Sequence, residues 1–147
     1  MTERYHYTES GLDFVYLANG FAIRETPRGR VVSFTDLDGL HAAIGRFIVT
    51  ERRRLSGQEV RFLRHELDLG QAELAELLGV TERTVARWEK GDIELPVTAD
   101  ATLRAMYREH LHEEPAVTES LHAMRAIDEQ DDRRLDLIED HGWDKAA

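Results

Sequence analysis

Few residues in the sequence have the types and the spacing that catalysis or metal binding requires. It has no cysteine, which removes cysteine nucleophiles, thiolate zinc sites, iron–sulfur clusters and disulfides. Histidines that could ligate a metal show no fixed ligand spacing, and histidines scattered in this way are usually surface residues; they are His110, His112, His122 and His141. No nucleophile with a general base and no phosphate-binding glycine loop is recognisable. We therefore expect no enzymatic activity, no catalytic residue, no cofactor and no metal site.

Polar side chains that could contact a partner gather instead near the middle of the chain, on a predicted helix over residues 82–90. The apolar residues of this helix, of a preceding helix over residues 71–78 and of their flanks are spaced to face inward: Leu69, Leu74, Ala75, Leu78, Val80, Val85 and Trp88. This spacing leaves Arg83, Thr84 and Arg87 facing outward. Gly79 can end the first helix in a left-handed conformation, and Thr81 can cap the second. The pattern predicts two short helices joined by a tight turn.

Further helices must support this pair. Ser56 and Glu59 form a capping-box pattern, which predicts a helix over residues 57–67. After a loop that contains Pro96, apolar residues at helical spacing predict a last helix; they are Leu103, Met106, Tyr107 and Leu111.

The run over residues 69–91 closely resembles the helix-turn-helix of the Cro/C1-type (XRE) family. The shared features occur in register: Gln71, Leu74-Ala75, Leu78-Gly79-Val80, the β-branched Val85, and Trp88-Glu89 followed by Gly91. Gly70 departs from the Ser or Thr that the family usually has at this cap, and glycine is tolerated there. The resemblance implies a five-helix domain over residues 57–111 in a sequence-specific DNA-binding transcriptional regulator. Such regulators are typically dimeric autorepressors that read a palindromic operator.

The resemblance also implies roles for individual side chains. Glu82, Arg83 and Arg87 would contact base edges in the major groove, where arginine pairs with guanine and a carboxylate accepts from cytosine. Phosphate contacts would come from Gln71, Thr81, Thr84 and Lys90. Arg64 and Glu89 match a family pair that forms a structural salt bridge between helices. Residues 51–56 form a linker, whose arginines are either solvated or touch phosphates.

Residues 1–50 predict a smaller unit. Apolar stretches over residues 14–17, 21–25 and 30–34 alternate with turn signals, which predicts a three-stranded antiparallel meander. Asn19-Gly20 suits a type I′ hairpin turn. Leu37, Leu40, Ile44, Phe47 and Ile48 recur at helical spacing and predict a helix over residues 36–49 that covers the meander. This unit is a candidate dimerisation or partner module.

The acidity of the chain is concentrated at one end. The formal net charge is −10, of which residues 113–147 contribute 4 Lys/Arg against 11 Asp/Glu. Apolar residues spaced among these carboxylates predict an acidic helix within the tail of residues 112–147: Leu121, Met124, Ile127, Leu135 and Ile138. This helix would pack on its own domain or a dimer mate, bind a toxin or a polymerase, or compete with DNA for the basic face.

The sequence therefore predicts an α+β protein, with a β-meander and one helix followed by an all-α helix-turn-helix domain and an acidic C-terminal helix. The first function hypothesis is a homodimeric repressor that binds double-stranded DNA. The second is an antitoxin that binds a partner protein and represses its own operon, because the layout loosely resembles MqsA-type antitoxins, although their zinc-binding cysteines are missing here. With neither a membrane span nor a signal peptide in the sequence, we expect a cytoplasmic protein.

Overall fold

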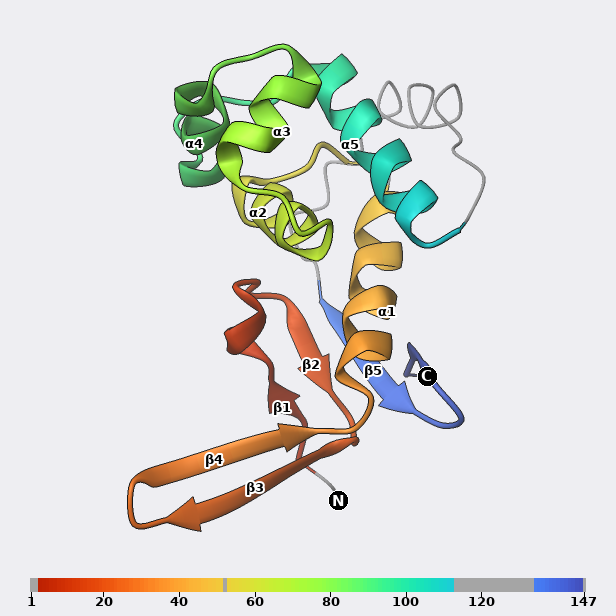
Figure 1. Ribbon diagram of the computed structural model, residues 1–147. Coiled ribbons are helices and arrows are strands. Elements are labelled where there is room, and N and C mark those ends of the chain that lie inside the picture. The colour runs from red at the N-terminus through yellow and green to blue at the C-terminus, as the bar shows by residue number, and fades with distance from the viewer. Residues whose placement is uncertain (1–2, 52, 113–133, 147) are drawn as a thin grey trace. The chain divides into compact units, whose positions relative to one another are not determined.

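The chain divides into two compact units in a computed structural model that describes residues 3–51, 53–112 and 134–146. Unit 1 consists of residues 1–44 together with residues 132–147, and unit 2 of residues 45–131. Strands begin and end the described chain and the α-helices lie between them, which confirms the predicted mixed α+β class (Figure 1). The boundary falls inside helix α1 (Leu37–Thr50), whose first residues belong to unit 1 and whose last belong to unit 2.

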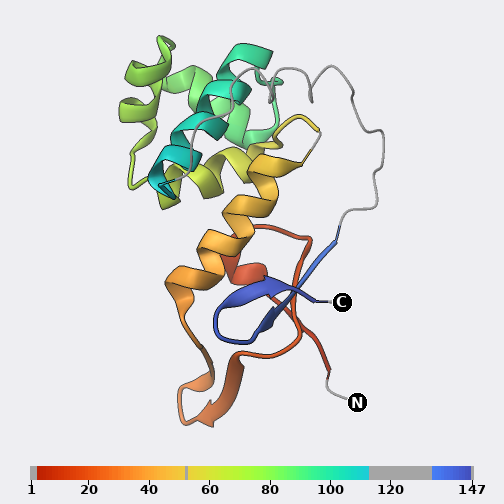
Figure 2. The same ribbon diagram turned by 90° about the vertical axis from the view of Figure 1, so that its right-hand side faces the viewer.

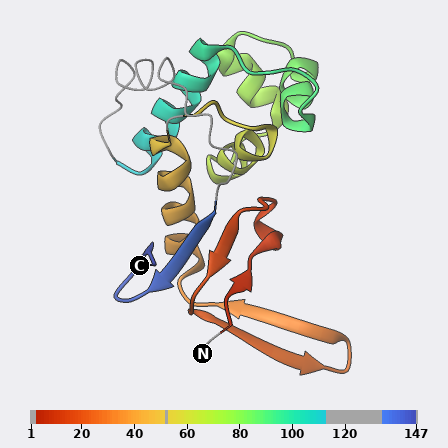
Figure 3. The same ribbon diagram turned by 180° about the vertical axis from the view of Figure 1, so that it is seen from behind.

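Unit 1 is built on a four-stranded sheet in the order β1-β2-β5-β6. Strand β2 (Val15–Leu17) pairs antiparallel with β1 (Tyr5–His6) and parallel with β5 (Leu135–Glu139), and β5 pairs antiparallel with β6 (Trp143–Lys145). Figure 3 shows β2 and β5 side by side. A short 3-10 turn (Thr8–Ser10) lies between β1 and β2.

The predicted three-stranded meander is wrong, because β2 does not pair with β3 (Phe21–Thr26). Strands β3 and β4 (Gly29–Phe34) form a separate two-stranded ribbon. The inner residues of β2 and β5 alternate along the strands and are almost completely buried: Val15, Leu17, Leu135 and Leu137. Burial against a strand from the other end of the chain therefore outweighs pairing with the next segment.

Asn19 and Gly20 do not form the expected hairpin turn; they hold the C-terminal strands in place. The Asn19 side chain donates to the carbonyl of Glu139 (3.2 Å) and accepts from the Glu139 amide (2.6 Å). Gly20 has φ +77°, and a Cβ there would lie 2.4 Å from Cη2 of Trp143. The indole of Trp143 also donates to the carbonyl of Thr35 (2.9 Å). Glycine is needed both for the backbone conformation and for the close approach of the ring.

The C-terminal residues form strands where an acidic helix was predicted. Leu135 and Ile138 lie in β5, where Leu135 is buried and Ile138 is 38% exposed. They lie on opposite faces of the strand, since the side chains of a strand alternate. The other residues of the predicted helix, Leu121, Met124 and Ile127, fall outside the described residues. Removal of residues 113–147 would delete β5, an inner strand of the unit 1 sheet.

The helix predicted over residues 36–49 is confirmed as α1, with Leu40, Ile44 and Ile48 fully buried. Leu37 differs from the expectation, because it is 43% exposed.

Unit 2 adds α2 (Gly57–Glu66), α3 (Gln71–Leu78), α4 (Glu82–Lys90) and α5 (Val97–His110) (Figure 2). Residues 57–111 therefore contain four helices, where five were predicted. The described chain has five α-helices in all, because α1 precedes these four. The capping box at the start of α2 is present: the Ser56 hydroxyl accepts from the Glu59 amide (3.3 Å), and the Glu59 carboxylate accepts from the Ser56 amide (2.7 Å). A common core joins the four helices, and it includes Leu63, Leu74, Val85, Trp88, Leu103 and Tyr107.

Candidate nucleic-acid interface

Helix α4 has one face in the core of unit 2 and the other in solvent. Val85 and Trp88 are 0% and 2% exposed. The exposed side chains of this helix and its N-cap include five of the sequence-predicted contact residues: Thr81, Glu82, Arg83, Arg87 and Lys90. Among the described residues, neither Arg83 nor Arg87 has an ion-pair or hydrogen-bond partner. Two guanidinium groups one helical turn apart are therefore available to an external acceptor.

The start of α4 is held by its own hydroxyl groups. Thr81 is the N-cap residue, and its Oγ1 accepts from the Thr84 amide (3.2 Å). The two threonine hydroxyls are themselves 2.9 Å apart. An N-cap of this kind satisfies an amide that has no intrahelical partner. The first turn of α4, which carries Glu82 and Arg83, is therefore well defined.

A short turn sets the position of α4 against α3. Gly79 ends α3 in the left-handed conformation with φ 71°, and the Val80 amide donates to the Ala75 carbonyl (2.9 Å). Leu74 and Ala75 of α3 are buried. The helix ends, the turn and the left-handed Gly79 agree with the prediction for residues 71–90.

Three helices meet at the carboxylate of Glu89. Arg64 of α2 donates from Nε to Oε2 (2.6 Å) and from Nη2 to Oε1 (2.9 Å) of Glu89, and from Nη1 to the Leu69 carbonyl (3.0 Å). Gln71, the first residue of α3, donates from Nε2 to Oε1 of Glu89 (3.1 Å). The side chains of Arg64 and Glu89 are only 10% and 6% exposed. The pair joins α2 to α4 and orients the Gln71 amide.

A second buried ion pair in α5 was not predicted from the sequence. Arg104 donates from Nε to Oδ1 of Asp100 (2.6 Å), and the two side chains are 2% and 0% exposed. Asp100 also accepts from the Leu55 amide (2.7 Å), while Arg104 donates to backbone carbonyls at the end of α1 and in residues 51–53. Asp and Arg four residues apart on a helix are a local signal for a pair. No local sequence pattern indicates that the pair is buried or that it forms hydrogen bonds with the backbone of residues 51–55.

Helix α2 approaches the end of α4 too closely for any side chain at Gly57. A Cβ at this position would lie 2.4 Å from the Trp88 carbonyl oxygen and 2.6 Å from that of Glu89. We expect Gly57→Ala to lower the free energy of unfolding by about 1–3 kcal/mol through overpacking. Alanine is otherwise a better helix former than glycine, so a loss of stability would come from the close contact and not from helix propensity.

Urea denaturation of the full chain measures this effect. Gly70→Ser is the matched control, because a Cβ at Gly70 meets only a Glu73 carboxylate oxygen at 3.4 Å, and serine is a favourable N-cap. The control should be at least as stable as the parent. A Gly57→Ala variant as stable as the parent would contradict the close approach of α2 and α4.

Three of the histidines considered as metal ligands, His110, His112 and His141, lie in the described parts of the chain. In the parts of the chain that the structure describes, no group of three or more His, Asp or Glu residues could hold a metal ion. His122 lies outside these parts. None of the described helices is long and apolar enough to cross a membrane.

Comparison with known proteins places this site in a family. Residues 60–98 match the model of the Helix-turn-helix family, which spans the segment from α2 into α5. No significant match occurs among curated proteins or among solved structures. The family consists of DNA-binding regulators. Residues 60–98 therefore form a DNA-binding helix-turn-helix of the Cro/C1 (XRE) type.

Proposed function

We propose that the protein is a sequence-specific repressor that binds a palindromic operator as a homodimer, with the N-terminal part of α4 in the major groove. The observation that carries this proposal is the pair of exposed guanidinium groups of Arg83 and Arg87, without partners among the described residues, on a helix anchored by Val85 and Trp88. The major groove of B-DNA admits an α-helix, and arginine can donate two parallel hydrogen bonds to guanine.

Around this centre we assign the remaining contacts by their chemistry. Glu82 would accept from a cytosine amino group, and Lys90 and the hydroxyls of Thr81 and Thr84 would contact phosphates. Gln71 has two amide hydrogens, and only one is needed for its bond to Glu89. The second can be donated to a phosphate, while the first holds the amide in place.

A dimer would place two copies of α4 in successive major grooves, about 34 Å apart. The operator would then consist of two inverted half-sites separated by about one helical turn. Regulation of the gene's own expression would place this operator upstream of its coding sequence.

Fluorescence anisotropy with that upstream DNA and with a scrambled fragment, each at two salt concentrations, tests the proposal. Both fragments are needed because phosphate contacts alone give salt-dependent binding that is blind to sequence. Selective binding, with two protomers per palindrome, is the expected result. Equal binding of both fragments would contradict the proposal and point to a protein partner, as for an antitoxin.

Substitution of the base-contacting residues gives a sharper result. Arg83→Ala and Arg87→Ala should each weaken operator binding by about 1–3 kcal/mol and relax the preference at one base pair per half-site, because alanine cannot donate the two hydrogen bonds to guanine. Their stability should stay within about 0.5 kcal/mol of the parent, since both side chains are exposed.

Arg61→Ala is the control, as it removes an exposed arginine from α2 in the same unit. This variant should keep the base preference of the parent. An Arg83→Ala protein with unchanged operator affinity and unchanged preference would reject the assignment of that residue.

A further inference from the structure

The ribbon of β3 and β4 concentrates positive charge in an acidic protein. The chain has a formal net charge of −10, yet residues 24–30, the ribbon tip, contain three arginines and one glutamate. The three arginines, Arg24, Arg28 and Arg30, are exposed. The ribbon tip therefore differs in charge from the chain that carries it.

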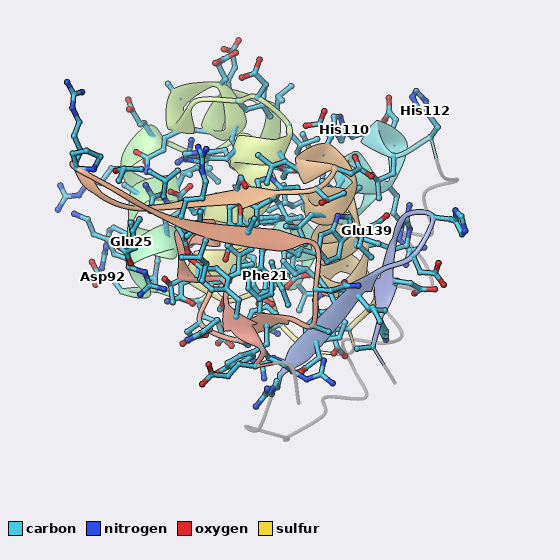
Figure 4. All side chains as sticks on the ribbon, turned by 90° about the horizontal axis from the view of Figure 1, so that it is seen from below. Phe21, Glu25, Asp92, His110, His112 and Glu139 are labelled. Carbon is cyan, nitrogen blue, oxygen red and sulfur yellow. The ribbon has the colours of Figure 1, made fainter. Side chains whose placement is uncertain are left out.

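The base of the ribbon is anchored within unit 1, while its tip is not. The ring of Phe21 lies 5.2 Å from that of Tyr5, and Phe34 lies 4.8 Å from Tyr7, between ring centroids. Toward the tip, Ile23 and Val31 are 40% and 43% exposed. Figure 4 shows the ribbon with Phe21 near its base and Glu25 farther along.

Hydrogen bonds join the two strands as far as the tip. The strands pair in register up to Thr26 and Gly29. The Thr26 hydroxyl donates to the Gly29 carbonyl (2.6 Å) and accepts from the Arg28 amide (3.2 Å). Arg24 pairs with Val31, and the next pair along the ribbon is Glu25 with Arg30. Side chains of successive pairs point to opposite faces, so Arg24 and Arg30 lie on opposite faces of the ribbon. Arg28 is in the turn between the strands. The three arginines are therefore distributed over both faces of the ribbon and its turn.

These guanidinium groups are open to an anionic partner. Arg24 and Arg28 have no ion pair among the described residues, and Arg30 meets only Glu25 at 3.7 Å. Both side chains of that pair are mostly exposed, at 64% and 78%, and such pairs contribute little. Guanidinium is the side-chain group best matched to the oxygens of a phosphate.

We propose that the ribbon tip binds backbone phosphates of DNA, as a second contact that is independent of base sequence. This inference rests on the proposed function for the identity of the nucleic acid. Helix α4 offers only three cations, Arg83, Arg87 and Lys90, beside the carboxylate of Glu82. The ribbon tip adds three more, and each one bound to phosphate makes binding more dependent on salt.

Anisotropy titrations of the full chain with upstream and scrambled DNA across a salt series test the proposal. In an R24Q/R28Q/R30Q variant, the slope of log K against log salt should fall in magnitude by about 0.9 for each arginine–phosphate pair that the substitutions remove. The fall should occur on both fragments, and the ratio of their affinities should not change. Each such pair corresponds to a change of about threefold in affinity when the salt concentration rises fourfold.

Two further variants separate charge from folding. Glu25→Gln removes the only carboxylate of the ribbon tip and should strengthen binding at low salt, whereas damage to the ribbon would weaken it. Arg134→Gln removes an arginine of unit 1 that already donates to Asp136 (2.7 and 3.2 Å), so it should leave the slope unchanged.

The outcomes distinguish this inference from the proposed function. Equal affinity of the parent for both fragments, with a reduced slope in R24Q/R28Q/R30Q, would reject sequence-specific repression and support the ribbon contact. An unchanged slope in this variant would overturn the ribbon contact, whatever the preference of the parent. If the variant keeps the slope of the parent but differs from it in sedimentation coefficient, the ribbon contact with DNA is overturned. The ribbon tip would then form an interface between two copies of the chain.

Discussion

Substituting methionine for Arg104 is expected to lower the free energy of unfolding by about 3–5 kcal/mol. The Arg104 side chain is 2% exposed and forms an ion pair with Asp100, which is fully buried. Its guanidinium also donates to the carbonyls of Ile48 (3.0 Å), Val49 (3.1 Å) and Glu51 (2.8 Å), and to the carbonyl of Arg53.

The reason for so large an effect is the set of groups that the substitution leaves behind. The last carbonyls of a helix lack the usual intrahelical partner, and two of those at the end of α1, the carbonyls of Ile48 and Val49, accept from Arg104. Methionine fills much of the same volume but donates no hydrogen bond. The variant would bury the Asp100 carboxylate without its cation and would remove a hydrogen-bond donor from four backbone carbonyls, and each of these losses costs free energy.

Urea denaturation measures the destabilisation, and a double-mutant cycle attributes it. Asp100→Asn removes the buried charge but keeps an oxygen that can accept from the Leu55 amide. The double variant should therefore be destabilised by less than the sum of the two single variants. Arg61→Met, which alters an exposed arginine, should change stability by less than about 0.5 kcal/mol. An Arg104→Met protein as stable as this control would refute the role of Arg104.

Loss of Glu89 is the second change for which we expect a large effect. Glu89→Ala removes the acceptor of three hydrogen bonds, two from Arg64 and one from Gln71. Arg64, whose side chain is 10% exposed, is left as an uncompensated cation. We expect the free energy of unfolding to fall by about 3–5 kcal/mol. DNA binding should fall with it, because α4 is tied to α2 through this pair.

Stability and binding have to be measured together to interpret this variant. Arg83→Ala should bind the operator more weakly while remaining folded, whereas Glu89→Ala should be impaired in both respects. Glu89→Gln keeps one carbonyl oxygen and should be more stable than the alanine variant. A Glu89→Ala protein that is fully stable but fails to bind the operator would show that Glu89 acts in DNA contact rather than in structure.

Most of the helical part of unit 2 could be predicted from local signals along the chain. The capping box of Ser56 and Glu59, the left-handed Gly79 and the cap at Thr81 each act within a few residues, and the apolar spacing repeats within one or two helical turns. Such signals are independent of the rest of the chain. The same locality made the helix-turn-helix recognisable, while the contacts of Glu82, Arg83 and Arg87 remain predictions until DNA binding is measured.

The arrangement of unit 1 and the anchoring of residues 51–55 depend instead on contacts between distant segments. Leu135 and Leu137 are spaced for a strand, but only burial against Val15 and Leu17 makes them one. Asn19-Gly20 is a strong hairpin signal, yet it binds Glu139 and fits against Trp143. Arg104 likewise meets carbonyls about fifty residues away in the sequence. Turn and strand signals describe what a segment can do, and the free energy of burying an apolar face against a distant segment selects among those possibilities.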